Sequence, residues 1–401
     1  MKRLLTLAAL TSLALTAGCG PKAPTVFAVV DTLPGGVLRV QNPAPSGWSD
    51  TAHITFTEIG RIQPADGEAG ELGDIWGMVL DDEGGVWVAQ PGPTRIGRFA
   101  PDGSYRGEVG RQGSGPGEYQ GAMLIWAGGH LFVQDPTNQR TSVFDTAGKF
   151  VSSWHSSCCI WRDVGGDTLG RAYIPVMPSD GGMDQMGQGW IRYTVDGTVV
   201  DTLWSPASNL TMKYWEFSPG PGSRSRYGIP YQPGIVDAPF AGGGLLIGQN
   251  DSYSIRISRT GKDTALVFGR KWTPEPIPES VRRTRFDEMT EKNEPLKAVA
   301  KFEDIPATAP AYRGFEWDPK GRIWVQLSVP ADTVGTYWDL FTPDGVWLGT
   351  VHAPFKSDAF LIRRGEVVVS STDENDLPVI IRYRINEAGS GDTPATTKLG
   401  S

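Results

Sequence analysis

Residues 129–154, with the sequence GHLFVQDPTNQRTSVFDTAGKFVSSW, predict three consecutive β-strands. Short apolar or alternating stretches at 131–133, 141–144 and 150–154 are rich in residues that favour strands. The segments DPTN at 135–138 and TAG at 146–148 are typical of loops and tight turns. Three strands need further strands to bury both faces, so the architecture depends on whether this unit recurs.

The unit occurs six times, and its register follows from two sets of turn glycines and a shared glutamine. The first-turn glycines are Gly85, Gly129, Gly170, Gly244, Gly321 and Gly365. Five residues after them, four units carry glutamine, at Gln90, Gln134, Gln249 and Gln326. A second turn glycine follows in five units, at Gly103, Gly148, Gly197, Gly261 and Gly345.

The last unit ends after the strand-like run 379–384 and has no fourth strand. The alternating segment HITFTEI at 53–59 precedes the first unit and can supply it. A ring closed in this way leaves no long strand edge exposed. The sequence therefore predicts an all-β, six-bladed β-propeller closed by an N-terminal strand.

The strand-turn-strand pattern of 131–151 and the glycine-rich link GRQGSGPGEY at 110–119 resemble NHL-type and TolB-like six-bladed propellers of bacterial exported lipoproteins. The resemblance covers residues 53–385. Its motifs are structural, so it implies a fold more than a function.

The N-terminal segment indicates export. Residues 1–18 combine Lys2 and Arg3 with an apolar run, 4–15, that is too short to cross a bilayer, as in a signal peptide. Small residues before Cys19 resemble a lipoprotein lipobox, which implies a lipid on Cys19 and anchoring to the cell envelope, at the outer membrane. Residues 19–52 then read as a flexible spacer, and 386–401 as a disordered tail.

Composition narrows the class of partner. The net charge of −8, without a run of Lys or Arg, does not favour nucleic acid. The 51 glycines and 31 prolines agree with a turn-rich all-β chain. The expected partners are an envelope protein, a peptide or a glycan, bound by a monomer.

Connection lengths distinguish the two faces of the predicted ring. The elaborated face holds the loop after the second strand of each blade and the links between blades, and it receives all the long segments. The plain face holds tight turns. Function on a rigid scaffold usually lies in its long loops. One link, at about 272–310 between the fourth and fifth blades, predicts a helix that begins near Pro278. This helix is either a solvated cap over part of the ring or a lid or docking element.

Acidic residues stand near the expected starts of five innermost strands, at Asp74, Asp163, Asp237, Glu316 and Asp358. Carboxylates that converge on one axis require a cation, protons or polar partners. Ca²⁺ suits Asp163, Asp237, Glu316 and Asp358, with Gln134, Gln249 and Gln326 as further channel candidates. Similar six-bladed lactonases hold a metal in this channel. The alternative is that these acids bond backbone amides of neighbouring loops.

Cys158 and Cys159 are adjacent in a link between blades, and an exported chain favours their oxidation to a vicinal disulfide. Such a disulfide could stiffen the loop, provide an apolar ledge for a ligand, or act in redox or soft-metal chemistry.

The sequence contains no HExxH, GxSxG, paired CxxC or Walker motif. The principal hypothesis is therefore a membrane-tethered envelope propeller that binds a ligand or protein through its elaborated face. The alternative is a calcium-dependent hydrolase or lactonase that uses the acidic channel, and a structural role in an envelope assembly is third. Whether the chain is an enzyme is left open, with a preference for a non-enzyme.

Overall fold

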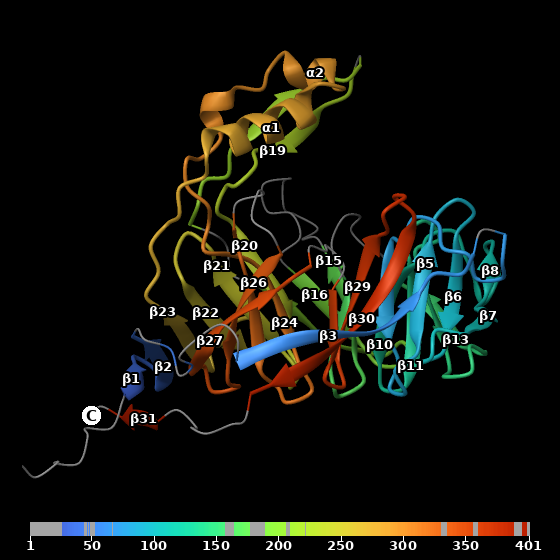
Figure 1. Ribbon diagram of the computed structural model, residues 1–401, viewed down its shortest axis with the longest axis horizontal. Helices are drawn as coiled ribbons and strands as arrows, with labels where there is room; N and C mark the ends of the chain where they lie inside the picture. Colours follow the sequence, from blue (N-terminus) through green and yellow to red (C-terminus); the bar gives the residue numbers. More distant parts are fainter. Residues whose placement is uncertain are drawn as a thin grey trace, which may run out of the picture.

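The computed structural model describes residues 26–43, 46, 48, 53–65, 67–156, 164–176, 189–205, 209–220, 222–329, 335–355, 360–388 and 395–398. Six antiparallel four-stranded units form the ring that Figure 1 shows from the side. The fourth unit is extended by three more strands. The predicted six-bladed β-propeller is confirmed.

From the innermost strand outward, the first three blades are β4 (Gly77–Leu80), β5 (Val86–Gln90), β6 (Arg95–Phe99), β7 (Tyr105–Glu108); β10 (Met123–Ala127), β11 (His130–Asp135), β12 (Arg140–Phe144), β13 (Phe150–His155); and β14 (Gly165–Gly166), β15 (Ala172–Val176), β16 (Gly189–Tyr193), β17 (Val199–Trp204). The last three are β20 (Ile235–Pro239), β21 (Leu245–Gln249), β22 (Ser254–Ser258), β23 (Leu266–Arg270); β24 (Tyr312–Trp317), β25 (Ile323–Leu327), β26 (Thr336–Phe341), β27 (Trp347–Ala353); and β28 (Phe360–Arg363), β29 (Glu366–Thr372), β30 (Pro378–Glu387), β3 (Ile54–Ile62). The two-residue strands β8 (Arg111–Gln112) and β9 (Glu118–Tyr119) pair in the link between blades 1 and 2.

The ring is closed by β3, which pairs antiparallel with β30 as the outer strand of blade 6. The chain therefore completes its last blade with a strand that precedes the first. Ile54 and Ile62, at the ends of β3, are each only 1% exposed. Each innermost strand contacts the innermost strand of the next blade, and β28 returns to β4.

The turn glycines lie where the sequence spacing predicted. Five of the six first-turn positions have positive φ, and blade 1 uses Gly84 (φ 92°) instead of Gly85. All five second-turn glycines have positive φ. A residue with a side chain is strained in this conformation, so these positions favour glycine. The spacing of the glycines in the sequence therefore indicates where the turns lie.

An aspartate fixes the first turn in blades 1, 3 and 5. One carboxylate oxygen of Asp81, Asp167 or Asp318 accepts from turn amides, as Asp318 does from Lys320 and Arg322. The other oxygen accepts from an aromatic side chain six residues later: from Trp87 Nε1 at 3.0 Å, Tyr173 Oη at 2.8 Å and Trp324 Nε1 at 3.1 Å. The three rings are 0% exposed, so this bond satisfies a buried donor while it orients the core.

The chain before β3 is not a flexible spacer throughout, so that prediction is wrong for residues 26–42. Strands β1 (Val26–Leu33) and β2 (Val37–Asn42) form a hairpin, and β2 pairs parallel with β23, the outer strand of blade 4. Val40 packs in the core that contains Phe268. The side-chain amide of Asn42 donates to Gly269 O and Gly345 O at 2.9 Å, which fixes the hairpin to two blades.

The predicted tail also contains structure. Strand β30 continues to Glu387, and β31 (Ala395–Lys398) pairs parallel with β1. The prediction of disorder over 386–401 is therefore wrong for these residues. The valine-rich sequence of β1 offers a strand edge, and an edge accepts a further strand regardless of the distance along the chain.

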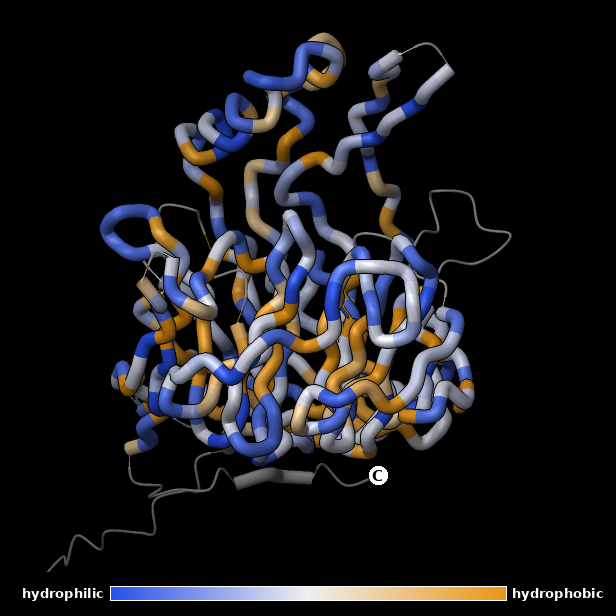
Figure 2. Tube along the Cα trace, turned by 90° about the vertical axis from the view of Figure 1, so that its right-hand side faces the viewer, coloured by the Kyte–Doolittle hydropathy of each residue, from blue (hydrophilic) through white to orange (hydrophobic). Residues whose placement is uncertain are grey.

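Two inter-blade links build a separate unit, which we call the cap. It consists of the hairpin β18 (Tyr214–Phe217) and β19 (Ser225–Gly228), with α1 (Glu279–Thr290), α2 (Glu294–Lys297) and η3 (Phe302–Asp304). The helical insertion confirms the prediction for 272–310. Figures 1 and 2 show the cap standing off the ring on the elaborated face, and hydrophobic segments concentrated in the ring below it.

The cap has its own core, formed by Trp215, Ile229, Leu296 and Ile305 with Phe286 packed against them. Trp215 Nε1 donates to Asp304 Oδ2 at 2.9 Å, and Phe286 meets the Trp215 ring edge-on. The helix therefore packs on the hairpin rather than directly on the blades.

Candidate functional site

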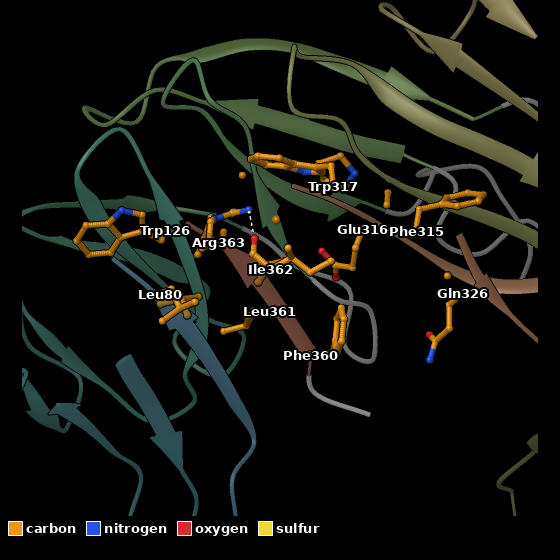
Figure 3. A pocket seen from close by; sticks show the side chains of 18 of the residues that line it. Leu80, Trp126, Phe315, Glu316, Trp317, Gln326, Phe360, Leu361, Ile362 and Arg363 are labelled. Atoms are coloured by element: carbon orange, nitrogen blue, oxygen red, sulfur yellow. Dashed lines mark hydrogen bonds between the residues drawn. The ribbon is translucent and has the colours of Figure 1, made fainter. Parts of the chain in front are cut away.

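A cavity of 380 Å³ lies on the axis of the ring, and all six innermost strands contribute to its wall. Because each of these strands runs from the elaborated face to a tight turn on the plain face, position along a strand gives depth in the channel. Aliphatic and aromatic residues make up most of the lining, and Trp126, Phe315, Trp317 and Phe360 are among the aromatic ones (Figure 3). Polar atoms nevertheless make up the larger part of the exposed wall, so this cavity is more polar than a usual ligand site.

Arg363 and Glu316 place a cation and an anion at the plain-face end of the cavity (Figure 3). Arg363 is the last residue of β28, and its guanidinium lies 4.2 Å from the centroid of the Trp317 ring. Burial lowers the pKa of Arg363, and the carboxylates of Glu316 and Asp82 oppose that shift. A cation held over an indole ring and near a carboxylate is restricted in position.

Asp237 lies halfway along β20 and also lines the cavity. Its Oδ2 accepts from Ser205 Oγ at 2.5 Å, where the chain leaves blade 3. Asp237 and Glu316 therefore line one cavity, as the sequence analysis expected. They lie at different depths, however, because Glu316 is the penultimate residue of β24, and its expected position near the elaborated face is wrong.

Arg313 and Gln326 lie nearer the elaborated face, at the start of β24 and on β25. The amide oxygen of Gln326 accepts from Arg313 Nε at 3.0 Å and Nη2 at 2.6 Å in the amide orientation that satisfies both groups. Arg313 is thus a second cation in the cavity wall, and unlike Arg363 it is an exposed residue.

The glutamines that recur in the sequence do not converge on the cavity. Gln326 lines it, whereas Gln249 donates to Asp251 Oδ1 at 3.1 Å. Gln90 accepts from the amide of Gly73 at 2.6 Å and so ties its blade to the preceding link. Gln134 is 0% exposed, and neither polar atom of its amide has a hydrogen-bond partner within the described ranges. The four glutamines therefore occupy the same position in their blades but have different surroundings and partners.

Several predicted site residues lie outside the described residues. They are Cys19, Cys158, Cys159, Asp163 and Asp358. The lipid anchor, the vicinal disulfide and two of the four predicted calcium ligands therefore stay predictions. In the described part of the chain, no group of three His, Cys, Asp or Glu side chains is arranged to hold a metal ion. The helices of that same part include none long and apolar enough to cross a membrane.

Sequence reasoning missed Arg363 and Arg313 in the cavity wall, and it did not single out Trp76, which lies outside that wall. The signal that could have found Arg363 is its position at the end of an innermost strand, two residues before the turn glycine Gly365. This segment was interpreted only as a turn. Trp76 precedes β4, its amide donates to Ala89 O at 2.9 Å, and its side chain is 66% exposed at the elaborated-face end of that strand. The signal that could have found Trp76 is its position in the sequence, immediately before an innermost strand.

No family model and no curated protein matches the chain. Among solved structures, it is similar to a putative exported protein from Bacteroides fragilis, with 11% identity and a TM-score of 0.49 over 87% of this chain and 100% of that one. A member of the DUF4221 family from Bacteroides vulgatus matches at 9% identity and a TM-score of 0.44, over 84% of this chain and all of that one. Virginiamycin B lyase from Staphylococcus aureus matches at 12% identity and a TM-score of 0.40, over 82% and 99%. At these values no activity is carried over to this chain.

Proposed function

We propose that this chain is an exported, lipid-anchored β-propeller that binds a small ligand, or the end of a peptide or glycan, in its axial channel. The observation that carries this proposal is the 380 Å³ cavity to which every blade contributes. Its volume lies in the range of about 300–1,000 Å³ that is usual for ligand pockets. The proposed export and anchoring rest on residues 1–19 of the sequence.

The polar groups of the channel favour binding over turnover. Arg363 interacts electrostatically with Glu316, and Ser205 donates a hydrogen bond to Asp237. Both carboxylates therefore already have partners within the protein. To act as a general base, one of these carboxylates would have to be within reach of a substrate proton. To bind a metal ion, it would have to exchange its present partner for the ion. A ligand with one apolar ring and one charged group would find aromatic side chains in the wall, and the charges of Arg363 and Glu316 at the plain-face end.

The alternative is a calcium-dependent hydrolase or lactonase. It is supported by the position of Asp237 and Glu316 in one cavity. This alternative requires Ca²⁺ to displace Ser205 from Asp237 and to compete with Arg363 for Glu316.

A channel-filling variant tests the proposal. Gly314 lines the cavity, and an added Cβ would approach only one terminal atom of the Gln326 side-chain amide, at 3.4 Å. Gly314→Leu should therefore fold and fill part of the cavity. Gly60→Leu is the matched control, because Gly60 lies on the outer strand β3 with no atom within 4 Å of its Cβ position.

A library of small organic acids, amino acids and sugars would be screened by thermal unfolding of the mature protein. We expect ligands that bind the parent and Gly60→Leu and are weakened at least tenfold in Gly314→Leu. Equal affinity in all three proteins, or the absence of any binder, would contradict a channel site.

A further inference from the structure

A second cavity, of 400 Å³, lies on the face of blade 4 that packs against blade 3. Strand register defines this face: Ile247 pairs with Arg256, and Arg256 pairs with Val267. Since alternate residues of a strand share a face, Gln249 and Ser254 lie on the same side. Toward the axis, Ile247 packs with Tyr173, Trp190 and Leu203 of blade 3, and this core separates the cavity from the channel.

Arg256 is the one residue with a formal charge in the wall of this cavity, as far as the described residues define it. It is half-buried, and it makes no hydrogen bond, ion pair or ring contact within the described ranges. Seven other half-buried or buried arginines are each paired with a carboxylate, namely Arg39, Arg171, Arg192, Arg226, Arg270, Arg322 and Arg382. The remaining half-buried arginines of the described residues each donate to at least one backbone carbonyl, namely Arg95, Arg98, Arg140, Arg282 and Arg363. Among the half-buried arginines that the structure describes, Arg256 is thus the one without a carboxylate, carbonyl or aromatic partner.

The environment of Arg256 disfavours its charge. Burial lowers the pKa of this guanidinium, and no carboxylate opposes the shift. Asp237 shares the face, but Ile247 lies between the two in the sheet, and Asp237 already holds Ser205. A partly buried cation without a counter-charge destabilises the folded protein, and a bound anion would offset part of this cost.

The rest of the wall supplies neutral hydrogen-bonding groups. Asn209, Ser252, Ser254 and Thr264 line the cavity with Arg256. Ser252 Oγ is 3.5 Å from Gln249 O, at the limit of a hydrogen bond, so its hydroxyl can turn to a ligand. Hydroxyl and amide donors around a guanidinium form the usual setting for an oxyanion, since arginine donates two parallel bonds to carboxylate or phosphate.

We propose that this cavity between blades 3 and 4 is a second binding site, which takes a small oxyanion (phosphate, sulfate or carboxylate) through Arg256. Ile235 and Val267 line the same cavity and offer apolar contact to whatever group carries the anion. The site is separate from the channel, so it stands whether or not the channel binds a ligand.

The test uses thermal unfolding of the mature protein in sodium phosphate, sodium sulfate and sodium benzoate, each compared with sodium chloride at equal ionic strength. An anion that binds only the folded protein must raise the midpoint, and about ten times the Kd should raise it by about 2 °C. Arg256→Gln removes the charge but keeps a polar side chain of similar reach. Arg259→Gln is the control, because Arg259 is an exposed arginine three residues later in the chain.

We expect at least one of the three anions to raise the midpoint of the parent and of Arg259→Gln, and to leave Arg256→Gln unchanged. Arg256→Gln should itself unfold at or above the parent temperature in chloride, because it removes an uncompensated charge. A crystal soaked in selenate supplies a readout that does not depend on the variants, with anomalous density expected beside Arg256. No response of the parent to any anion, or an equal response of parent and Arg256→Gln, would overturn the proposal.

Discussion

The carboxylate of Asp339, on β26 of blade 5, forms a buried ion pair with Arg270 at the end of β23 in blade 4. Asp339 is 0% exposed and also accepts from Tyr253 Oη at 2.6 Å and Thr350 Oγ1 at 2.6 Å. The Arg270 guanidinium in turn lies over the rings of Tyr253 and Trp347. One carboxylate therefore joins two blades at the place where the β1–β2 hairpin also attaches.

Replacing Asp339 with Asn should destabilise the protein by about 3 kcal/mol, because Arg270 would stay buried without a counter-charge. Urea unfolding of both proteins measures the difference. Asp344→Asn, in an exposed turn of the same blade, should change the free energy of unfolding by no more than about 0.5 kcal/mol. A loss below about 1 kcal/mol in Asp339→Asn would show that the pair does not hold the blades together.

Ring closure should depend on Ile62. This residue is 1% exposed at the end of β3 and packs with Leu80, Phe99 and Ile380, so it joins blade 6 to blade 1. Ile62→Ala should cost about 3 kcal/mol, through lost burial and the cavity it leaves. Ile59→Ala on the same strand is the control, since Ile59 is 37% exposed. Equal losses in the two variants, measured by urea unfolding, would mean that closure does not depend on this contact.

The blades could be predicted because their determinants are local. A turn that needs positive φ shows as a glycine in the sequence, and the strands on either side show as short alternating runs. The attachment of the 26–42 hairpin to blade 4 escaped prediction because β23, with which β2 pairs, is more than 200 residues away. The local signals of a hairpin were present, namely two apolar runs on either side of Gly35 and Gly36, which both have positive φ, but nothing local indicates that this hairpin joins blade 4.

The site was predictable only in part, for a related reason. The sequence placed Asp237 and Glu316 on strands that line the axis, and both line the cavity. It did not indicate that Arg363 of blade 6 approaches Glu316 and Trp317 of blade 5, because that contact depends on how adjacent blades are spaced. Carboxylates on the axis require a cation, protons or polar partners. In the structure Asp237 accepts a hydrogen bond from Ser205, and Arg363 is the cation near Glu316.

Chelation should leave the stability of the mature protein unchanged. Since Asp237 and Glu316 have partners within the protein, we expect the unfolding midpoints in EDTA and in Ca²⁺ to agree within about 1 °C. The double variant Asp237→Asn, Glu316→Gln is the comparison. A calcium-dependent rise in the parent that this variant abolishes would instead support the hydrolase or lactonase alternative. A rise that persists in the variant would place calcium elsewhere.

The cap should unfold independently of the blades. Trp215 is 3% exposed at the centre of its core, so Trp215→Ala removes the contact between hairpin and helices. We expect hydrogen exchange of amides in α1 and α2 to accelerate at least tenfold, while amides of β11, β21 and β25 keep their protection. Tyr227→Ala, which changes a 41% exposed ring on β19, should alter neither. Loss of protection in the blades as well would show that the cap and the ring fold as one unit.

Asp263 should make stability depend on pH in the acid range. Burial raises the pKa of its carboxyl, but hydrogen bonds from Thr260, Ser258 and Arg259 outweigh burial and lower the pKa from 3.8 to about 2. A pKa lowered in the folded state stabilises the protein above the unfolded value, so this contribution is present above pH 3.8 and is lost as pH falls toward 2. After allowance for solvent screening, it should amount to about 1 kcal/mol.

Asp263→Asn should therefore be less stable than the parent at pH 6, by about 1 kcal/mol, and the difference should shrink as pH falls from about 4 to about 2. Urea unfolding at a series of pH values measures it, with Asp344→Asn as the exposed control. If the difference between parent and Asp263→Asn stayed constant over that range, the four hydrogen bonds to this carboxylate would not favour its charged form.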